Sequence, residues 1–166
     1  ISFNQIQFYD FKTTYLIGNE WWRLITPMFI HFSPTHLIFN SLWIYILGRE
    51  IEQLDGKIIF ISLILFTSIS SNYLQYSFSG PSLFGGLSGV VYGLLGYCFV
   101  SETFLRISKF SFPPAIYIFM FVWLLIGFTG FLDLLGFGKI ANFAHLGGLL
   151  SGILSGYIFS MYNKKN

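Results

Sequence analysis

A serine, an asparagine and two of the three histidines in this chain are of types that can take part in acyl-transfer chemistry. Ser88 follows a glycine-rich stretch in the segment Gly86-Leu87-Ser88-Gly89, and His145 lies near the carboxyl end. His36 and Asn40 are four residues apart, so on a helix they would share one face. A serine hydroxyl becomes a nucleophile when a histidine within hydrogen-bond reach takes its proton, and N–H donors stabilise the oxyanion that forms. These residue types therefore allow acyl transfer if the fold brings them together.

Each of these residues also has a purely structural interpretation. A serine that opens a helix caps its first N–H groups, which would account for Ser88. A pair such as His36 and Asn40 can bind each other or a neighbouring carbonyl, and a single histidine such as His145 is often a hydrogen-bonded packing residue. The short glycine–serine pattern is weak on its own. Whether these residues are catalytic or structural depends on where the surrounding elements place the four side chains.

The composition restricts the class of protein. Of the 166 residues, 54% are hydrophobic and only 10% are charged, whereas a soluble domain carries about 25% charge. A soluble globule and a disordered chain are both excluded on this ground. The net charge of +2 is too small for a nucleic-acid surface, and a single cysteine, Cys98, excludes an intramolecular disulfide. We expect an all-α integral membrane protein.

Stretches without Asp, Glu, Lys or Arg mark the expected membrane spans, and they cover residues 24–48, 58–101, 110–132 and 140–163. A helical span needs about 20 apolar residues, so three of the stretches hold one helix each. The longest stretch holds two, because the segment 75–89 is rich in glycine and serine, contains a proline and must reverse the chain. We expect five spans, over residues 34–50, 57–76, 88–104, 113–131 and 141–162.

Lysine and arginine residues orient these spans. More of them flank one side of the expected bundle (Arg49, Lys57, Arg106, Lys109, Lys164 and Lys165) than the other (Lys12, Arg23 and Lys139). The richer side should be cytoplasmic, and so should the C-terminus. Residues 1–33, the 77–87 turn and the 132–140 loop are then external. Residues 1–33 mix aromatic side chains with a few charges, which predicts a loop lying in the membrane interface.

This topology places Ser88, His145, His36 and Asn40 at the same depth, near the external ends of three spans. Their common depth favours a catalytic site, with Ser88 as nucleophile, His145 as base, and His36 and Asn40 as oxyanion donors. Asp133 is the only external acid near the last span, but it falls in or near a loop. We therefore predict a serine–histidine dyad without an acid.

A stripe of small residues runs along the last expected span, with members at every fourth position: Ala144, Gly148, Gly152 and Gly156. In a membrane such a stripe lets two helices approach closely. We expect another helix to contact the backbone of this span near the position of His145.

Several longer motifs carry a family resemblance, and together they run from residue 21 to about 160. They are Trp22-Arg23, His31-Phe-Ser-Pro-Thr-His36-Leu-Ile-Phe-Asn40, Glu52-x-x-x-Gly56, Phe78-Ser-Gly-Pro, Phe84-Gly-Gly-Leu-Ser88-Gly-Val-Val-Tyr92 and Ala144-His145-x-x-Gly148. The chain closely resembles the rhomboid intramembrane serine proteases, most of all those of the bacterial GlpG type. The resemblance implies a serine endopeptidase with a Ser88–His145 dyad and an oxyanion hole made by His36, Asn40 and the backbone N–H of Ser88.

The resemblance also implies further roles. Tyr92 would stack on His145 and hold its ring, and His31 would help to keep water near the site. Phe119 and Trp123 would belong to a lateral gate for a substrate helix. Two features depart from the GlpG-type pattern: Phe143 replaces a small residue two positions before the histidine, and the region 127–135 is about three residues longer.

For the whole chain, the resemblance implies one rhomboid membrane domain over residues 1–166. Its five spans would be family helices two to six, and the first family helix would precede Ile1. The chain lacks a signal-peptide pattern and does not begin with Met, so we expect a fragment or a processed form. The implied partners are transmembrane protein substrates and the lipid bilayer, with no cofactor and no metal. The implied location is the bacterial inner (plasma) membrane, with the site open to the external, periplasmic side.

Two other functions fit the composition. A catalytically silent rhomboid-like protein could bind transmembrane helices, but such relatives typically lose the serine or the histidine, and this chain has both. A small transporter or channel would favour acidic residues within the spans or interrupted helices in paired halves. Acidic residues occur in the expected spans only near their cytoplasmic ends, at Glu50 and Glu102, and the chain shows no internal repeat.

Overall fold

The computed structural model describes residues 12–80, 82–105, 109–110, 112–134 and 140–163, and these residues form helices and connecting segments without a strand. This confirms the expected all-α fold. The α-helices are α1 (Pro34–Asp55), α2 (Lys57–Ser79), α3 (Ser88–Leu105), α4 (Pro114–Phe128), α5 (Phe131–Leu134) and α6 (Asn142–Asn163). Before them come one short π-helix and two 3-10 helices, η1 (Lys12–Ile17), η2 (Trp21–Leu24) and η3 (Thr26–Phe29).

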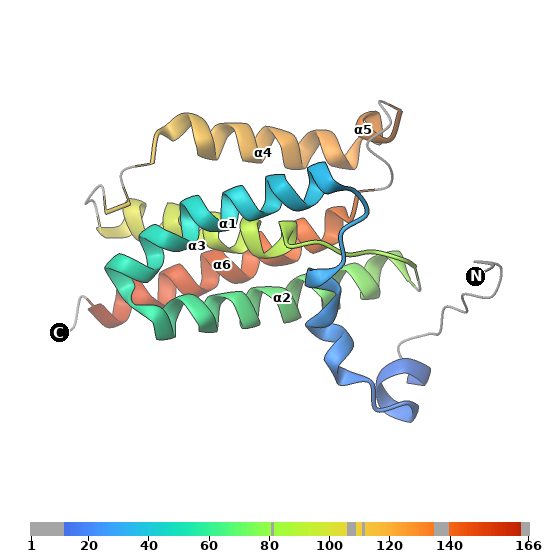
Figure 1. The fold of residues 1–166 in the computed structure, drawn as a ribbon. Coiled ribbons are helices and arrows are strands. Elements are labelled where there is room, and N and C mark those ends of the chain that lie inside the picture. Colours follow the sequence, from blue (N-terminus) through green and yellow to red (C-terminus); the bar gives the residue numbers. More distant parts are fainter. Residues whose placement is uncertain (1–11, 81, 106–108, 111, 135–139, 164–166) are drawn as a thin grey trace.

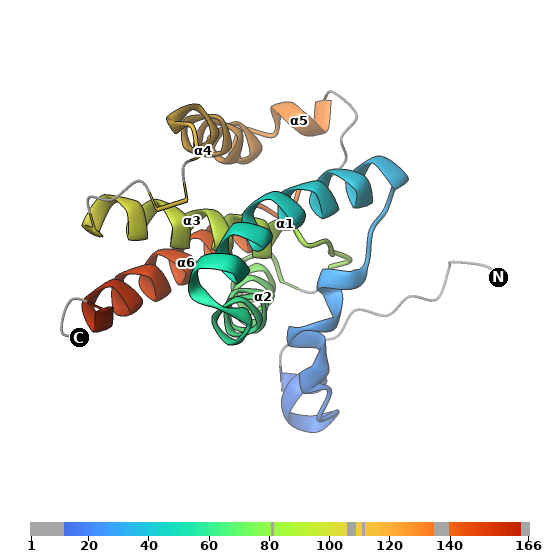
Figure 2. The ribbon, with the colours of Figure 1, turned by 60° about the vertical axis from the view of Figure 1, so that its left-hand side comes forward.

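Helices α1, α2, α3, α4 and α6 run along roughly one direction, and the segment before α1 crosses one end of the bundle (Figure 1). Helices α3 and α6 pack against each other in the middle, and α2 packs against both. Helix α4 is the outermost helix on the side away from α2 in both views (Figures 1 and 2). It packs only sparsely against α3 and α6.

The helix starts lie within one residue of the expected starts, but three helix ends differ by three or more residues, those of α1, α2 and α4. Helix α1 begins at Pro34 because the Ser33 hydroxyl accepts a hydrogen bond from the His36 backbone N–H, at 3.1 Å, and proline suits the first helical position. It continues to Asp55, beyond the expected end at residue 50. The expected span 113–131 is broken, because α4 ends at Phe128 and Gly130 adopts a φ of 73°.

Within the described residues, two helices are long and apolar enough to cross a membrane by themselves: α2 and the Asn142–Tyr162 part of α6. Helix α4 is also apolar but shorter. Helix α1 carries four charged side chains in its last two turns: Arg49, Glu50, Glu52 and Asp55. Length and apolar character alone therefore support fewer spans than the five that the charge-free stretches predict.

The small-residue stripe of α6 faces α3 at very close range. A Cβ atom added at Gly148 would overlap the carbonyl oxygen of Gly89, and one at Gly152 would overlap that of Gly93. Only glycine permits this approach of two backbones. The first turns of α3 and α6 are consequently held side by side, and these turns carry Ser88 and His145.

Helix α2 carries a row of buried polar side chains, and two of them fix elements around the site. The row consists of Thr67, Ser68, Ser71, Asn72 and Gln75. The Asn72 amide donates to the Leu24 carbonyl oxygen at 2.8 Å, which ties the segment before α1 to the bundle. The Gln75 side-chain oxygen accepts the Ala144 backbone N–H at 3.0 Å. The same N–H also lies 3.0 Å from the Ala141 carbonyl oxygen, so two acceptors share it at the start of α6.

The segment before α1 leaves several apolar side chains exposed: Leu16, Ile17, Trp21, Trp22 and Phe29. Such exposure suits an element that lies in the membrane interface. Residues 1–11 lie outside the described residues, so the interfacial character of the whole 1–33 segment stays a prediction.

Candidate active site

A glycine-containing loop delivers Ser88 to the start of α3. Gly86 has a φ of 119°, a conformation that favours glycine, and its backbone N–H donates to the Pro27 carbonyl oxygen at 3.0 Å. A Cβ added at Gly86 would lie only 2.8 Å from His36 Nε2. The loop therefore packs directly against η3 and the first turns of α1, and Ser88 follows two residues later.

A hydrogen bond joins Ser88 to His145. The Ser88 Oγ and His145 Nε2 atoms are 2.8 Å apart, and His145 is 7% exposed. In the tautomer with Nε2 unprotonated, the serine hydroxyl donates to the histidine. A nucleophile and its base require this arrangement.

The ring of His145 is held by Tyr92. The two rings are stacked, with centroids 4.8 Å apart and planes inclined by 30°. Tyr92 is 2% exposed, and its hydroxyl donates to the Met120 carbonyl oxygen of α4 at 3.0 Å. The stack restrains the imidazole orientation, which a carboxylate does in a triad. The Asp133 side chain lies outside the described residues.

Two polar side chains of α1 approach the loop that precedes Ser88. A Cβ added at Gly86 would lie 3.5 Å from Asn40 Nδ2, compared with 2.8 Å from His36 Nε2. Asn40 is 3% exposed, and its Nδ2 finds no acceptor among the described residues. A buried unpaired donor is costly unless another group meets it. These side-chain donors and the backbone N–H groups at the start of α3 can donate hydrogen bonds to one oxygen on which negative charge develops.

His31 lies beside this group and outside the dyad. Its ring is 5.0 Å from that of His36, and its Nδ1 is 3.3 Å from the Phe29 carbonyl oxygen. Its buried Nε2 has no partner within the described part of the chain. The ring thus offers a free polar atom next to the candidate oxyanion donors, where a water molecule could bind.

The expected gate residues Phe119 and Trp123 lie one turn apart on α4, with ring centroids 5.8 Å apart. Phe119 is 47% exposed. The structure therefore brings His145 into direct contact with both Ser88 and Tyr92 and places the gate pair on a separate, outer helix.

Sequence reasoning missed two contributions to the site. Gln75 accepts a hydrogen bond from the backbone N–H of Ala144, which adjoins His145. In the sequence, the helical spacing of the polar residues along α2 is the pattern that indicates it. In the sequence, Phe143 stands out only as a departure from the GlpG-type pattern. It stacks on Phe78 at 5.1 Å and meets Phe128 edge-on at 5.5 Å, so it joins the ends of α2 and α4 over the start of α6.

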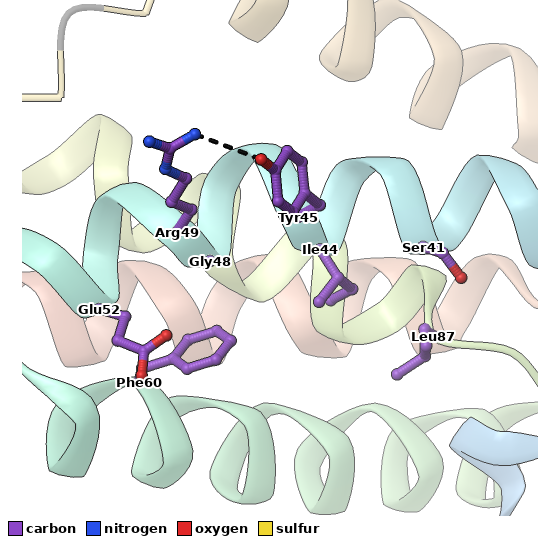
Figure 3. A pocket seen from close by; sticks show the side chains of 8 residues that line it. All are labelled: Ser41, Ile44, Tyr45, Gly48, Arg49, Glu52, Phe60 and Leu87. Carbon is purple, nitrogen blue, oxygen red and sulfur yellow. Dashed lines mark hydrogen bonds between the residues drawn. The ribbon is translucent and has the colours of Figure 1, made fainter.

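A cavity of about 430 Å³ also lies between α1 and α2 (Figure 3). Ser41 and Leu87, which adjoin Asn40 and Ser88 in the sequence, line part of this cavity. Arg49 and Glu52 line another part of it. The Arg49 side chain turns away from α2 and donates to the Tyr45 hydroxyl at 3.2 Å (Figure 3). The cavity is thus mostly apolar, with a charged end, and carries no catalytic group.

Comparison with known proteins identifies the family of the chain. A family model described as a rhomboid domain matches residues 18–162. The chain is 39% identical over 136 residues to the rhomboid protease GlpG of Serratia proteamaculans (strain 568). The aligned part covers 82% of this chain and 47% of that protein, so the chain spans about half the length of this relative.

Proposed function

The chain belongs to the rhomboid family of intramembrane proteases, and from this premise we propose that it is a serine endopeptidase that cleaves transmembrane segments of other membrane proteins. The observation that carries the proposal is the 2.8 Å contact between Ser88 Oγ and His145 Nε2 at the adjoining starts of two helices. A capping or packing role would not require a histidine acceptor for this hydroxyl.

The proposed membrane arrangement treats residues 1–166 as one domain in which α1, α2, α3, α4 and α6 are spans. The charged last turns of α1 lie at the cytoplasmic interface, and Asp55 is neutralised there by an ion pair with Lys109. The C-terminus is cytoplasmic, and the site opens to the external side of a bacterial inner membrane. A site near this face gives the reaction the water that lipid lacks.

In the proposed reaction the Ser88 oxygen attacks the carbonyl carbon of the scissile bond, and its proton passes to His145 Nε2. The oxyanion that forms accepts hydrogen bonds from His36, Asn40 and the Ser88 backbone N–H. The C–N bond then breaks, and His145 gives its proton to the leaving amine. A water molecule hydrolyses the acyl ester, with its proton passing through His145 back to the Ser88 oxygen.

The substrate must reach this site from the lipid. A transmembrane substrate would pass between α1 and α4, past Phe119 and Trp123, and unwind locally so that its carbonyl reaches Ser88. Helix α4 suits this role because it is the outermost helix and packs only sparsely on its neighbours. The aqueous supply would come past His31, whose Nε2 is unpaired among the described residues.

Replacing Asn40 by alanine should lower turnover of a transmembrane substrate by about 10²-fold, the effect of removing one oxyanion donor. Replacing His145 by alanine should lower it by about 10⁴-fold or more, because the base is lost and no other group takes the proton. Cleavage of a tagged single-pass substrate in liposomes measures both rates. Equal and complete loss in the two variants would argue against an oxyanion hole shared by several donors.

A further inference from the structure

Tyr92 touches two elements that the proposed reaction uses in different ways. Its ring stacks on His145, and its hydroxyl donates to the Met120 carbonyl oxygen at 3.0 Å. Both residues of this hydrogen bond are buried, at 2% and 4% exposure. One side chain therefore bridges the candidate base on α6 and the outer helix α4.

The hydrogen bond from the Tyr92 hydroxyl joins α4 at Met120, in the middle of that helix. Two other polar contacts hold α4 near its ends. At the external end the Asn142 amide donates to the Gly127 carbonyl oxygen at 2.8 Å, and at the other end the Tyr117 hydroxyl donates to the Glu102 carboxylate at 2.8 Å. Met120 also lies between the gate residues Phe119 and Trp123 in sequence. An outward movement of this part of α4 would take the Met120 carbonyl away from the Tyr92 hydroxyl.

We propose that the Tyr92 hydroxyl is a positioning group that holds α4 in its closed position and couples the opening of α4 to the orientation of His145. The inference rests on the proposed function and adds a role to it. Opening α4 breaks the bond to Met120, and the same event frees the Tyr92 ring that packs on the imidazole. The closed helix and the aligned base are thus held by one side chain.

The expected size of the effect on α4 opening follows from the measured strength of hydrogen bonds between helices within membranes. Such bonds are modest, so loss of one should change the ratio of open to closed α4 by about threefold. Tyr92→Phe is the suitable variant because it removes only the hydroxyl and keeps a ring on His145. Tyr97→Phe is the matched control, since Tyr97 lies on the same helix and its hydroxyl donates to Asp55 at 2.9 Å instead of to α4.

The first measurement does not depend on catalysis. In the full-length protein with Ser88→Ala, spin labels at Ile38→Cys on α1 and Leu125→Cys on α4 report the separation of the two helices, since both positions are exposed. The native Cys98 is buried and should not compete for the label. Tyr92→Phe should raise the ratio of long to short distances about threefold, and Tyr97→Phe should not. An unchanged ratio, or the same increase in both variants, would overturn the proposal.

The second measurement is kinetic and uses the active serine. For each variant, kcat/KM for a transmembrane substrate is divided by the rate at which a fluorophosphonate labels Ser88, so that effects on the dyad itself cancel. The quotient should rise about threefold in Tyr92→Phe alone. A quotient equal to that of the wild type would overturn the role of this hydroxyl in holding α4 closed, and a labelling rate equal to that of the wild type in Tyr92→Phe would overturn the coupling to His145. Absence of cleavage in the wild type would count against the proposed function, while the distance measurement would still decide on the bond to α4.

Discussion

Replacing Ser88 by alanine is expected to abolish cleavage of transmembrane substrates, with a loss of at least about 10⁴-fold, while the helical fold persists. The substitution removes the only atom proposed to attack the scissile carbonyl. Its structural cost is one hydrogen bond to His145, about 1 kcal/mol. Cleavage of a tagged substrate in liposomes measures the loss, and circular dichroism with size-exclusion chromatography confirms the fold.

A serine in the loop before α3 provides the matched control. Ser82 lies six residues before Ser88, and its hydroxyl is 3.4 Å from the Gly80 carbonyl oxygen. Ser82→Ala should keep nearly all activity because this hydroxyl has no part in the proposed reaction. Cleavage by Ser88→Ala at the wild-type rate would refute the assignment of the nucleophile.

The second large effect is expected at Gly148. A methyl group in Gly148→Ala would overlap the Gly89 carbonyl oxygen, so α3 and α6 would have to separate. Overpacking of this kind costs about 1–3 kcal/mol, which corresponds to a Tm lower by about 5 °C. The same separation pulls His145 away from Ser88, and a displacement of about 1 Å can lower activity about 10²-fold. Thermal unfolding in detergent and substrate cleavage test the two effects together.

The exposed face of α6 supplies the comparison for Gly148. Leu150 lies two residues further along the helix and is 53% exposed, so Leu150→Ala should leave Tm and activity close to wild type. A Gly148→Ala protein with unchanged Tm and activity would show that α3 and α6 do not pack this closely.

The sequence allowed the helical class and several helix starts to be predicted, because both depend on local features. The glycine-rich loop before Ser88, for example, marks the start of α3. Helix ends were harder to predict. Charges end a membrane span but do not end a helix, so α1 continues to Asp55, whose carboxylate is paired with Lys109 from a distant loop. The Thr129-Gly130 turn divides the expected fourth span.

The candidate site shows the same division between local and tertiary information. The common depth of Ser88 and His145 could be inferred from charge patterns, and the structure places the two side chains within hydrogen-bond distance. The bond from Tyr92 to Met120 and the bond from the Ala144 N–H to Gln75 join residues far apart in the chain. No spacing rule connects such residues, because their contact depends on how whole helices pack.

Fluorophosphonate labelling followed by mass spectrometry tests the central claim most directly. The full-length protein in detergent is treated with the reagent beside its His145→Ala variant, and the modified residue is identified in each. We predict an adduct on Ser88 in the wild type and none in the variant, because the hydroxyl needs His145 to take its proton. Absence of an adduct on Ser88 in the wild type, or equal labelling in the variant, would contradict an activated serine. Either result would leave a silent protein that binds transmembrane helices as the better account.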